Sequence, residues 1–213
     1  MIDYRIAYVD EAEADIRRFQ RYNYTMGPYF KEVIPVKPVA DIHELVSSIL
    51  STHCDALVVD FRLSEEAPEI KYDGGDVVKA FLEERPGFPV FILTTYEDEA
   101  VEQGPDVNLV NEKNMISEGN EKLLKKIEMQ IRKYKTEIDE KEKKLLSLLK
   151  TKSERPLSDT EEKDLIDLDT FIQKSLSGKS RISESSKIST NSDRLADLLK
   201  KADQILNKLE SSK

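Results

Sequence analysis

The sequence predicts an α/β fold with a doubly wound, five-stranded parallel sheet, followed by an all-helical extension. Three short apolar runs, 5–9, 56–59 and 90–93, are rich in β-branched or aromatic residues, and each is followed directly by polar residues. Continuous runs of this length are typical of strands buried on both faces, as in a parallel sheet covered by helices. Between the runs the periodicity becomes helical, so strands and helices alternate along the chain.

Two weaker apolar runs, 33–36 and 107–110, complete the set of five strands. Pro35 lies within the first of them, and proline is tolerated mainly in edge strands, so we expect this strand at an edge of the sheet. Helices are expected at 16–22, 42–50 and 77–82, where apolar residues recur at helical spacing. The acidic stretch 96–105 predicts a helix of only a turn or two.

From about residue 119 the pattern is wholly helical. Apolar residues recur at alternating spacings of three and four and continue, past Lys141, to two leucines: Leu124, Ile127, Ile131, Tyr134, Ile138, Leu145 and Leu148. This heptad seam predicts one long helix that extends the last helix of the α/β domain. The seam can pack against later helices of the same chain or pair with a second chain. Its length favours a homodimer.

These patterns divide the chain into three parts: an α/β domain at 1–118, a long helix at 119–150 and a helical C-terminal region at 151–213. Pro156 ends the long helix, and 157–161 has the sequence of a capped helix start. An apolar stripe follows, formed by Leu165, Leu168, Ile172 and Leu176. The serine- and lysine-rich segment 177–191 predicts a linker, and apolar spacing within 195–209 predicts a final amphipathic helix.

Composition excludes several classes of protein. The net charge is −9, yet residues 151–213 hold twelve basic and twelve acidic residues, and no segment is strongly basic. A DNA-binding output domain is therefore not expected. No window is apolar enough to span a membrane, and no secretory signal is evident, so we expect a cytoplasmic protein. The single cysteine, Cys54, excludes an internal disulfide. Both histidines precede residue 119, so the helical part cannot be a histidine phosphotransfer bundle.

Polar side chains follow the predicted strands, and in a doubly wound sheet the carboxyl ends of the strands form the ligand site. The residues concerned are Asp10, Glu11, Asp60, Thr94 and Lys113. Three carboxylates repel one another unless a hard cation lies among them, and Mg²⁺ suits oxygen ligands and phosphate. A carboxylate can also attack phosphorus, while a hydroxyl and an ammonium stabilise a transferring phosphoryl group.

This order of residues resembles the receiver domain of two-component response regulators. The local sequences also match, around the acceptor, before the third helix and after the fourth strand: Val59-Asp60-Phe61-Arg62-Leu63, Asp73-Gly74-Gly75 and Ile92-Leu93-Thr94-Thr95. The resemblance covers residues 3 to about 135.

The resemblance implies a role for each residue of the constellation. Asp60 would accept a phosphoryl group from a histidine kinase or a phosphotransfer protein. Mg²⁺ would be held by Asp10, Glu11, Asp60 and the backbone carbonyl of Arg62. Thr94, with Thr95 as the alternative hydroxyl, and Lys113 would bind the phosphoryl oxygens.

The resemblance thus implies a phosphorelay signalling protein whose helical extension relays its state to a downstream protein partner. We expect no enzyme activity beyond its own phosphorylation and dephosphorylation. The alternative is a pseudo-receiver, a phosphorylation-independent interaction or dimerisation scaffold. It is motivated by Glu11, Val110 and Asn114, where the family more often has aspartate, an aromatic residue and proline, and by the longer segment 64–72. A third hypothesis is a receiver that serves as a phosphoryl reservoir while the tail binds a partner constitutively.

Overall fold

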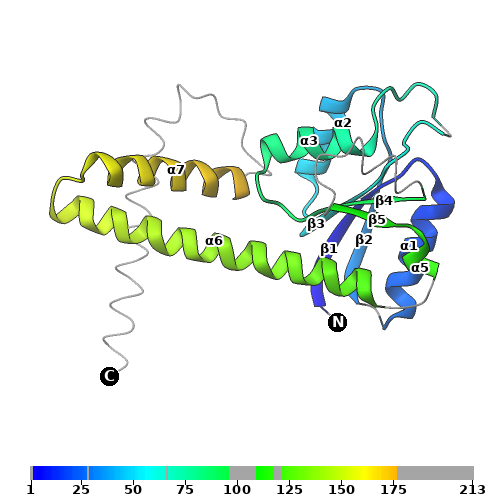
Figure 1. Cartoon of the computed structure of the whole chain (residues 1–213), viewed down its shortest axis with the longest axis horizontal. Helices are drawn as coiled ribbons and strands as arrows, with labels where there is room; N and C mark the ends of the chain where they lie inside the picture. The colour runs from blue at the N-terminus through cyan, green and yellow to red at the C-terminus, as the bar shows by residue number, and fades with distance from the viewer. Residues whose placement is uncertain (1, 28, 66, 96–108, 118–120, 177–213) are drawn as a thin grey trace. The chain divides into compact units, whose positions relative to one another are not determined.

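Five parallel strands form one sheet in the order β2-β1-β3-β4-β5 (Figure 1). The computed structural model describes residues 2–27, 29–65, 67–95, 109–117 and 121–176. The strands are β1 (Ile2–Val9), β2 (Phe30–Val36), β3 (Ala56–Asp60), β4 (Val90–Thr94) and β5 (Val110–Glu112). This strand order is that of flavodoxin-like folds, so the predicted doubly wound sheet is confirmed. The proline-containing strand β2 lies at an edge, as predicted.

The described helices are α1 (Glu13–Thr25), α2 (Ile42–Ser51), α3 (Gly74–Glu84), α5 (Asn114–Ser117), α6 (Lys122–Glu154) and α7 (Asp159–Leu176). The first three contain the predicted helical segments, and α6 and α7 are the predicted long helix and capped helix. The short helix α5 was not predicted from the sequence. The expected helix at 96–105, the linker at 177–191 and the amphipathic helix at 195–209 lie outside the described residues.

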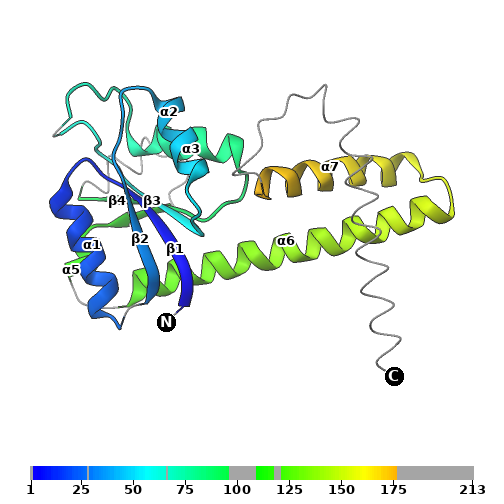
Figure 2. The same cartoon turned by 180° about the vertical axis from the view of Figure 1, so that it is seen from behind.

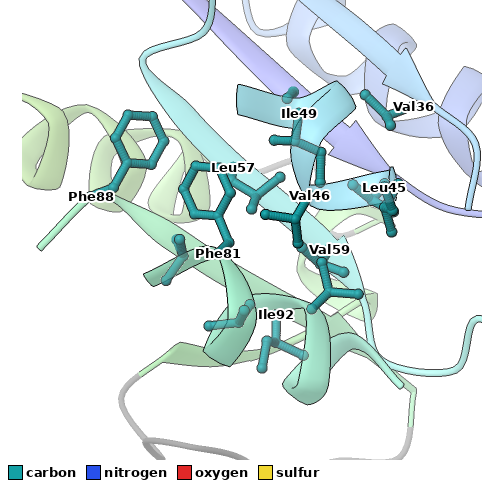
Figure 3. Close-up of a cluster of buried hydrophobic side chains, with 14 of the residues drawn as sticks. Val36, Leu45, Val46, Ile49, Leu57, Val59, Phe81, Phe88 and Ile92 are labelled. Atoms are coloured by element: carbon teal, nitrogen blue, oxygen red, sulfur yellow. The ribbon is translucent and has the colours of Figure 1, made fainter. Parts of the chain in front are cut away.

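Helices cover both faces of the sheet (Figures 1 and 2). Successive residues of β3 point to opposite faces: Leu57 and Val59 pack with α2 and α3, whereas Ala56 and Val58 pack with α1 and α6. Figure 3 shows part of the apolar cluster that contains Leu57 and Val59. In this cluster the rings of Phe81 and Phe88 meet edge to face, with 5.3 Å between their centroids. Burying each such side chain contributes about 1.5–3 kcal/mol to the free energy of folding. The apolar clusters on the two faces of the sheet therefore fix the positions of the strand ends.

The N-terminus of α3 packs directly against the end of β3. Asp73 and Asp76 form a reciprocal capping box that starts the helix. The Gly74 amide donates to the Phe61 carbonyl at 2.8 Å, and a Cβ on Gly74 would overlap the carbonyl oxygen of Asp60. Only glycine permits this approach, so the Asp73-Gly74-Gly75 sequence sets the position of α3 beside Asp60.

The heptad seam of α6 is buried within the chain. Leu124, Ile127 and Ile131 are fully buried against the sheet, and Tyr134 reaches Phe88 at 5.5 Å between ring centroids. The later part of α6 contacts α7 and buries apolar residues from both helices: Leu145, Leu149, Leu168 and Ile172. At the end of the seam, the side chain that is buried belongs to Leu149, whereas that of Leu148, which the sequence predicted to be buried, is only half-buried.

Of the two arrangements considered from the sequence, the structure shows the seam packed against other parts of the same chain. The homodimer favoured from sequence would have to use a different face of α6, because the seam already has intrachain neighbours on the sheet and on α7. Periodicity specifies which face is apolar, but it does not specify what covers that face.

Helix α7 returns to the α/β domain. Its predicted capped start is confirmed, because the Ser158 hydroxyl accepts from the Glu161 amide while Glu161 accepts from the Ser158 amide. Further along, Phe171 packs against the core cluster, and the Lys174 ammonium donates to the Glu83 carbonyl of α3 at 3.1 Å. The three-part division at 118 and 150 stays a prediction. No described helix combines the length and apolarity that crossing a bilayer requires.

Candidate functional site

Three carboxylates gather at the carboxyl edge of the sheet. Asp10 and Glu11 follow β1, and Asp60 is the last residue of the neighbouring strand β3. These strands run parallel and pair through Val9 and Val59, so their ends meet at one edge. One oxygen from each carboxylate lies within 4.8 Å of the others. The structure thus brings the predicted side-chain ligands together, and their role as ligands stays a prediction.

Asp10 is fully buried and is held by two donors of its own segment. Its Oδ1 accepts from the Ala12 amide at 2.8 Å, and its Oδ2 accepts from the Tyr8 hydroxyl at 2.8 Å. Burial, followed by the negative charge of Asp10, raises the pKa of Tyr8, so this hydroxyl keeps its proton. The carboxylate of Asp10 is therefore fixed in orientation before any ligand arrives.

Asp60, the predicted acceptor, is only 5% exposed. Burial raises the pKa of Asp60 to about 7, because the surrounding protein solvates its negative charge less well than water does. The Lys113 ammonium opposes this shift, while the charges of Asp10 and Glu11 add to it. Asp60 is thus a buried carboxyl group whose charge depends on the cations around it.

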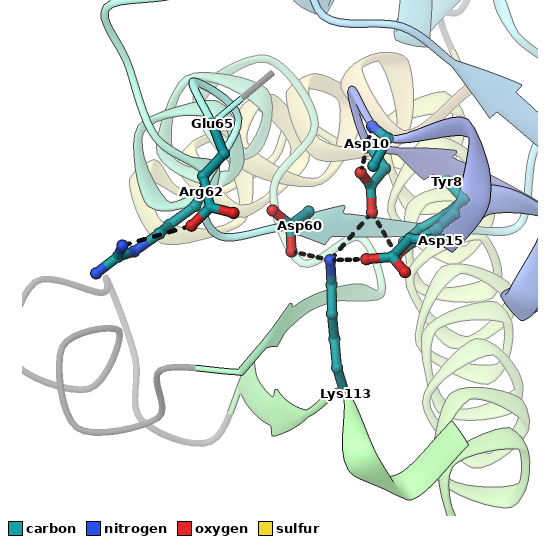
Figure 4. A network of polar contacts seen from close by, with 8 residues as sticks. Tyr8, Asp10, Asp15, Asp60, Arg62, Glu65 and Lys113 are labelled. Carbon is teal, nitrogen blue, oxygen red and sulfur yellow. Dashed lines mark hydrogen bonds and ion pairs between the residues drawn. The ribbon is translucent and has the colours of Figure 1, made fainter. Parts of the chain in front are cut away.

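Lys113 follows β5 directly, and its ammonium enters the cluster (Figure 4). Its Nζ lies 2.7 Å from Asp60 Oδ1, 3.3 Å from Asp10 Oδ2 and 2.6 Å from Asp15 Oδ2. Burial alone would lower the pKa of Lys113, but the charges of Asp60 and Asp10 outweigh burial and raise it. Lys113 is therefore a protonated cation that partly neutralises the carboxylates.

The two threonines considered from sequence differ in burial, and the role of either hydroxyl stays a prediction. Thr94 is the last residue of β4, is 1% exposed, and its carbonyl accepts from the Lys113 amide at 2.8 Å. Thr95 is exposed. Arg62 follows β3, and its side chain pairs with Glu65 at 3.4 Å, directed away from the Asp60–Lys113 pair (Figure 4). The proposed ligand role of its carbonyl stays a prediction.

Sequence reasoning missed two residues of the site, Tyr8 and Asp15. A signal for each was present. Tyr8 lies two residues before Asp10, so an extended strand places both on one side. Asp15 lies four residues before Phe19, whose side chain is fully buried, so the helix places Asp15 on the inward face of α1. Strand and helix periodicity extended to polar residues would have found them.

The donor set suits a hard divalent cation. Carboxylate oxygens from Asp10, Glu11 and Asp60 can approach one point, and Mg²⁺ prefers oxygen ligands and retains waters that phosphate oxygens can replace. Sulfur and imidazole ligands, which favour zinc or copper, are absent from this group of residues. The residues present therefore fit Mg²⁺ on chemical grounds.

No protein-family model matches the sequence, and no curated protein matches it as a relative. Solved structures resemble its fold. The anti-anti-sigma factor PhyR from Bartonella quintana matches 66% of this chain with 14% identity and a TM-score of 0.46. The chain spans about half of the PhyR structure, 51% of its length.

Two further solved structures also resemble the fold. The beryllofluoride-activated DrrB receiver domain matches 52% of this chain and 82% of its own, with 19% identity and a TM-score of 0.35. The response regulator RcsB of Salmonella typhimurium matches 88% of this chain and 90% of its own, with 13% identity and a TM-score of 0.40.

The chain has a flavodoxin-like fold with a charged cluster at one edge of its sheet. Its five parallel strands follow the flavodoxin-like order, and the acidic cluster and Lys113 lie at the carboxyl edge of the sheet, where such folds bind their ligands.

Proposed function

We propose that this chain is a response-regulator-type signalling protein in which Asp60 accepts a phosphoryl group from a histidine kinase or a phosphotransfer protein. One observation carries the proposal: a buried carboxylate ends the central strand within 2.7 Å of a buried ammonium, beside two further carboxylates. An isolated buried ion pair stabilises a fold weakly, whereas this grouping suits chemistry on a phosphoryl group.

The proposed step is a direct phosphoryl transfer from a phosphohistidine of the partner to Asp60. An oxygen of Asp60 attacks phosphorus, and the new P–O bond forms as the donor's P–N bond breaks and the electron pair leaves with the imidazole. Lys113 and the Thr94 hydroxyl would bind the equatorial oxygens of the phosphoryl group, whose negative charge grows during transfer. Mg²⁺ held by Asp10, Glu11, Asp60 and the Arg62 carbonyl would supply further neutralisation of that charge.

Relay to the rest of the chain would begin at β4 and β5. Thr94 and Lys113 are joined through the Lys113 amide, so movement of either side chain acts on both strand ends. The helices α5 and α6 follow Lys113 in the chain. A shift between two arrangements of this segment would alter how the C-terminal helices present themselves to a downstream protein. We propose no catalysis beyond phosphorylation and dephosphorylation of the chain itself.

Incubation with Mg²⁺ and acetyl phosphate tests the acceptor. We expect intact-mass analysis to show one added phosphoryl group, which Asp60→Asn abolishes. Asp41→Asn is the matched control, because Asp41 caps α2 at the surface and asparagine caps a helix equally well. Absence of the added mass from the wild-type protein, or its persistence in Asp60→Asn, would refute the proposal.

One observation favours a second candidate, the phosphorylation-independent scaffold. The Lys113 ammonium already lies among Asp10, Asp15 and Asp60, so the cluster is partly neutralised without a metal. A scaffold of this kind would bind neither Mg²⁺ nor beryllofluoride (BeF₃⁻), and its mass in solution would not respond to them. Light-scattering mass and binding measurements with both ligands separate the two candidates.

A further inference from the structure

Asp15 is a fourth carboxylate at the site, in the first turn of α1, and the proposed phosphoryl transfer does not require it. Its Oδ2 lies 2.6 Å from Lys113 Nζ, the shortest of the three contacts of that ammonium. We propose that Asp15 is a positioning residue that holds the Lys113 ammonium toward α1 and competes for it with a phosphoryl group on Asp60. This inference rests on the proposed function.

The geometry of the ammonium supports competition. Lysine has three N–H donors, and three carboxylates, those of Asp10, Asp15 and Asp60, surround Lys113 Nζ. Figure 4 shows the ammonium between Asp60 on one side and Asp15 on the other. A phosphoryl group on Asp60 would draw the ammonium to its own oxygens, so the contact with Asp15 would lengthen. The Asp15 contact therefore opposes the phosphorylated arrangement.

The negative charge of Asp15 should also change the affinity of the site for Mg²⁺ and for a phosphoryl mimic, in opposite directions. The carboxylate of Asp15 adds negative charge to a site that already holds Asp10, Glu11 and Asp60. Extra negative charge attracts a divalent cation and repels the phosphoryl group or its anionic mimic. Neutralising Asp15 should therefore weaken Mg²⁺ binding and strengthen beryllofluoride binding. A structural defect at this edge of the sheet would weaken both, so opposite signs exclude a structural defect.

The same helical turn contains a matched control. Glu13 also lies in the first turn of α1, but it pairs with Arg17 at 3.1 Å and with Lys37 at 2.7 Å on the surface. Replacing Glu13 by glutamine removes one negative charge from the same turn and leaves the three contacts of Lys113 in place. A general effect of net charge or of the helix dipole would appear in this variant.

The experiment compares the full-length wild-type chain with Asp15→Asn, Asp15→Glu and Glu13→Gln. Calorimetry measures Mg²⁺ binding, and then beryllofluoride binding at saturating Mg²⁺. We expect Asp15→Asn to bind beryllofluoride about fivefold more tightly and Mg²⁺ about threefold more weakly, as for a partly buried ion pair worth about 1 kcal/mol. Asp15→Glu, which keeps the charge, and Glu13→Gln should stay within about twofold of wild type.

Each other outcome overturns the inference. Unchanged or weaker beryllofluoride binding by Asp15→Asn, with normal binding by the wild type, overturns the role of Asp15 and leaves the proposed function intact. An equal gain in Glu13→Gln also overturns it, because net charge alone would then explain the effect. No beryllofluoride binding by the wild type overturns the proposed function and this inference together.

Discussion

At the scale of single residues, the site concentrates charge where water is scarce. Asp10 and Asp60 are nearly inaccessible, and the carboxyl group of Asp60 has its pKa raised to about 7 mainly by burial. Ionising such a group costs folding free energy unless cations offset its charge. Asp60 is therefore a source of instability in the metal-free protein, as expected for a buried group whose role is chemical.

The first prediction concerns pH. The pKa of Asp60 is about 7 in the folded protein and roughly 3.9 in an unfolded chain. Between these values the folded state binds more protons, so its contribution to stability is present at low pH and is lost as pH rises through 7. We expect metal-free Asp60→Asn to exceed wild type by about 2 kcal/mol at pH 8, and the difference to shrink at pH 5.

Urea unfolding in EDTA at several pH values measures this difference. Acidic residues remote from the site are common to both proteins and cancel in the comparison, so the difference reports on Asp60 together with the charges that surround it, those of Lys113, Asp10 and Glu11. A constant difference between the two proteins from pH 5 to pH 8 would show that the carboxyl group of Asp60 ionises normally in the folded chain.

The second prediction concerns Tyr8, whose hydroxyl donates to Asp10 Oδ2 at 2.8 Å in the buried interior. Tyr8→Phe keeps the ring that stacks on Phe19 and removes only the donor to a charged acceptor. We expect a loss of about 2 kcal/mol in the free energy of unfolding, measured with urea. Tyr24→Phe is the control, since Tyr24 is 73% exposed and should change nothing. Equal stabilities for Tyr8→Phe and wild type would contradict the buried contact.

At the scale of elements, the turns between strands and helices position the site. The start of α3 depends on Gly74, because its amide binds the Phe61 carbonyl and a Cβ there would overlap the backbone of Asp60. The start of α1 depends on Asp10, which accepts from the Ala12 amide just before the helix. Each strand end thus forms one unit with the first turn of the helix that follows it. The end of β1 is tied to α1, and the end of β3 is tied to α3.

The third prediction tests this unit through Gly74→Ala. The added methyl group must displace α3 or the end of β3, so we expect a loss of about 3 kcal/mol or more in stability. We also expect reduced labelling of Asp60 by acetyl phosphate, because its backbone is the part that moves. Lys79→Ala, at an exposed position of the same helix, is the control. Wild-type stability together with wild-type labelling in Gly74→Ala would contradict the close approach.

At the scale of the whole molecule, α6 serves two packing surfaces along its length. Its first part closes the α1 side of the sheet, and its later part pairs with α7. Helix α7 in turn reaches the core cluster through Phe171 and the end of α3 through Lys174. Glu83, which accepts from Lys174, lies at the end of α3, whereas Asp60 lies beside the start of α3 at Gly74. A signal from Asp60 to α7 would therefore have to cross the length of α3.

The fourth prediction separates packing within the chain from dimerisation. Ile131 belongs to the seam and is fully buried. We expect Ile131→Ala to lower the free energy of unfolding by about 3 kcal/mol without changing the mass in solution measured by light scattering. Met129 lies on the same helix but is 70% exposed, so Met129→Ala should preserve both quantities. If the wild-type protein is a dimer and Ile131→Ala converts it into a folded monomer, the seam is a dimer interface, as the sequence predicted, and intrachain packing of the seam is contradicted.

Local sequence patterns predicted the doubly wound sheet, the edge position of β2 and the acidic, hydroxyl and ammonium groups that follow the strands. They could do so because strand and helix periods are local properties of the chain, and parallel strands necessarily end at one edge. Local patterns did not predict which neighbours these groups have. Asp15 pairs with Lys113, Thr94 rather than Thr95 is buried, and the α6 seam faces the sheet and α7. These outcomes depend on how elements distant in sequence pack, and local periodicity specifies an apolar face without naming its partner.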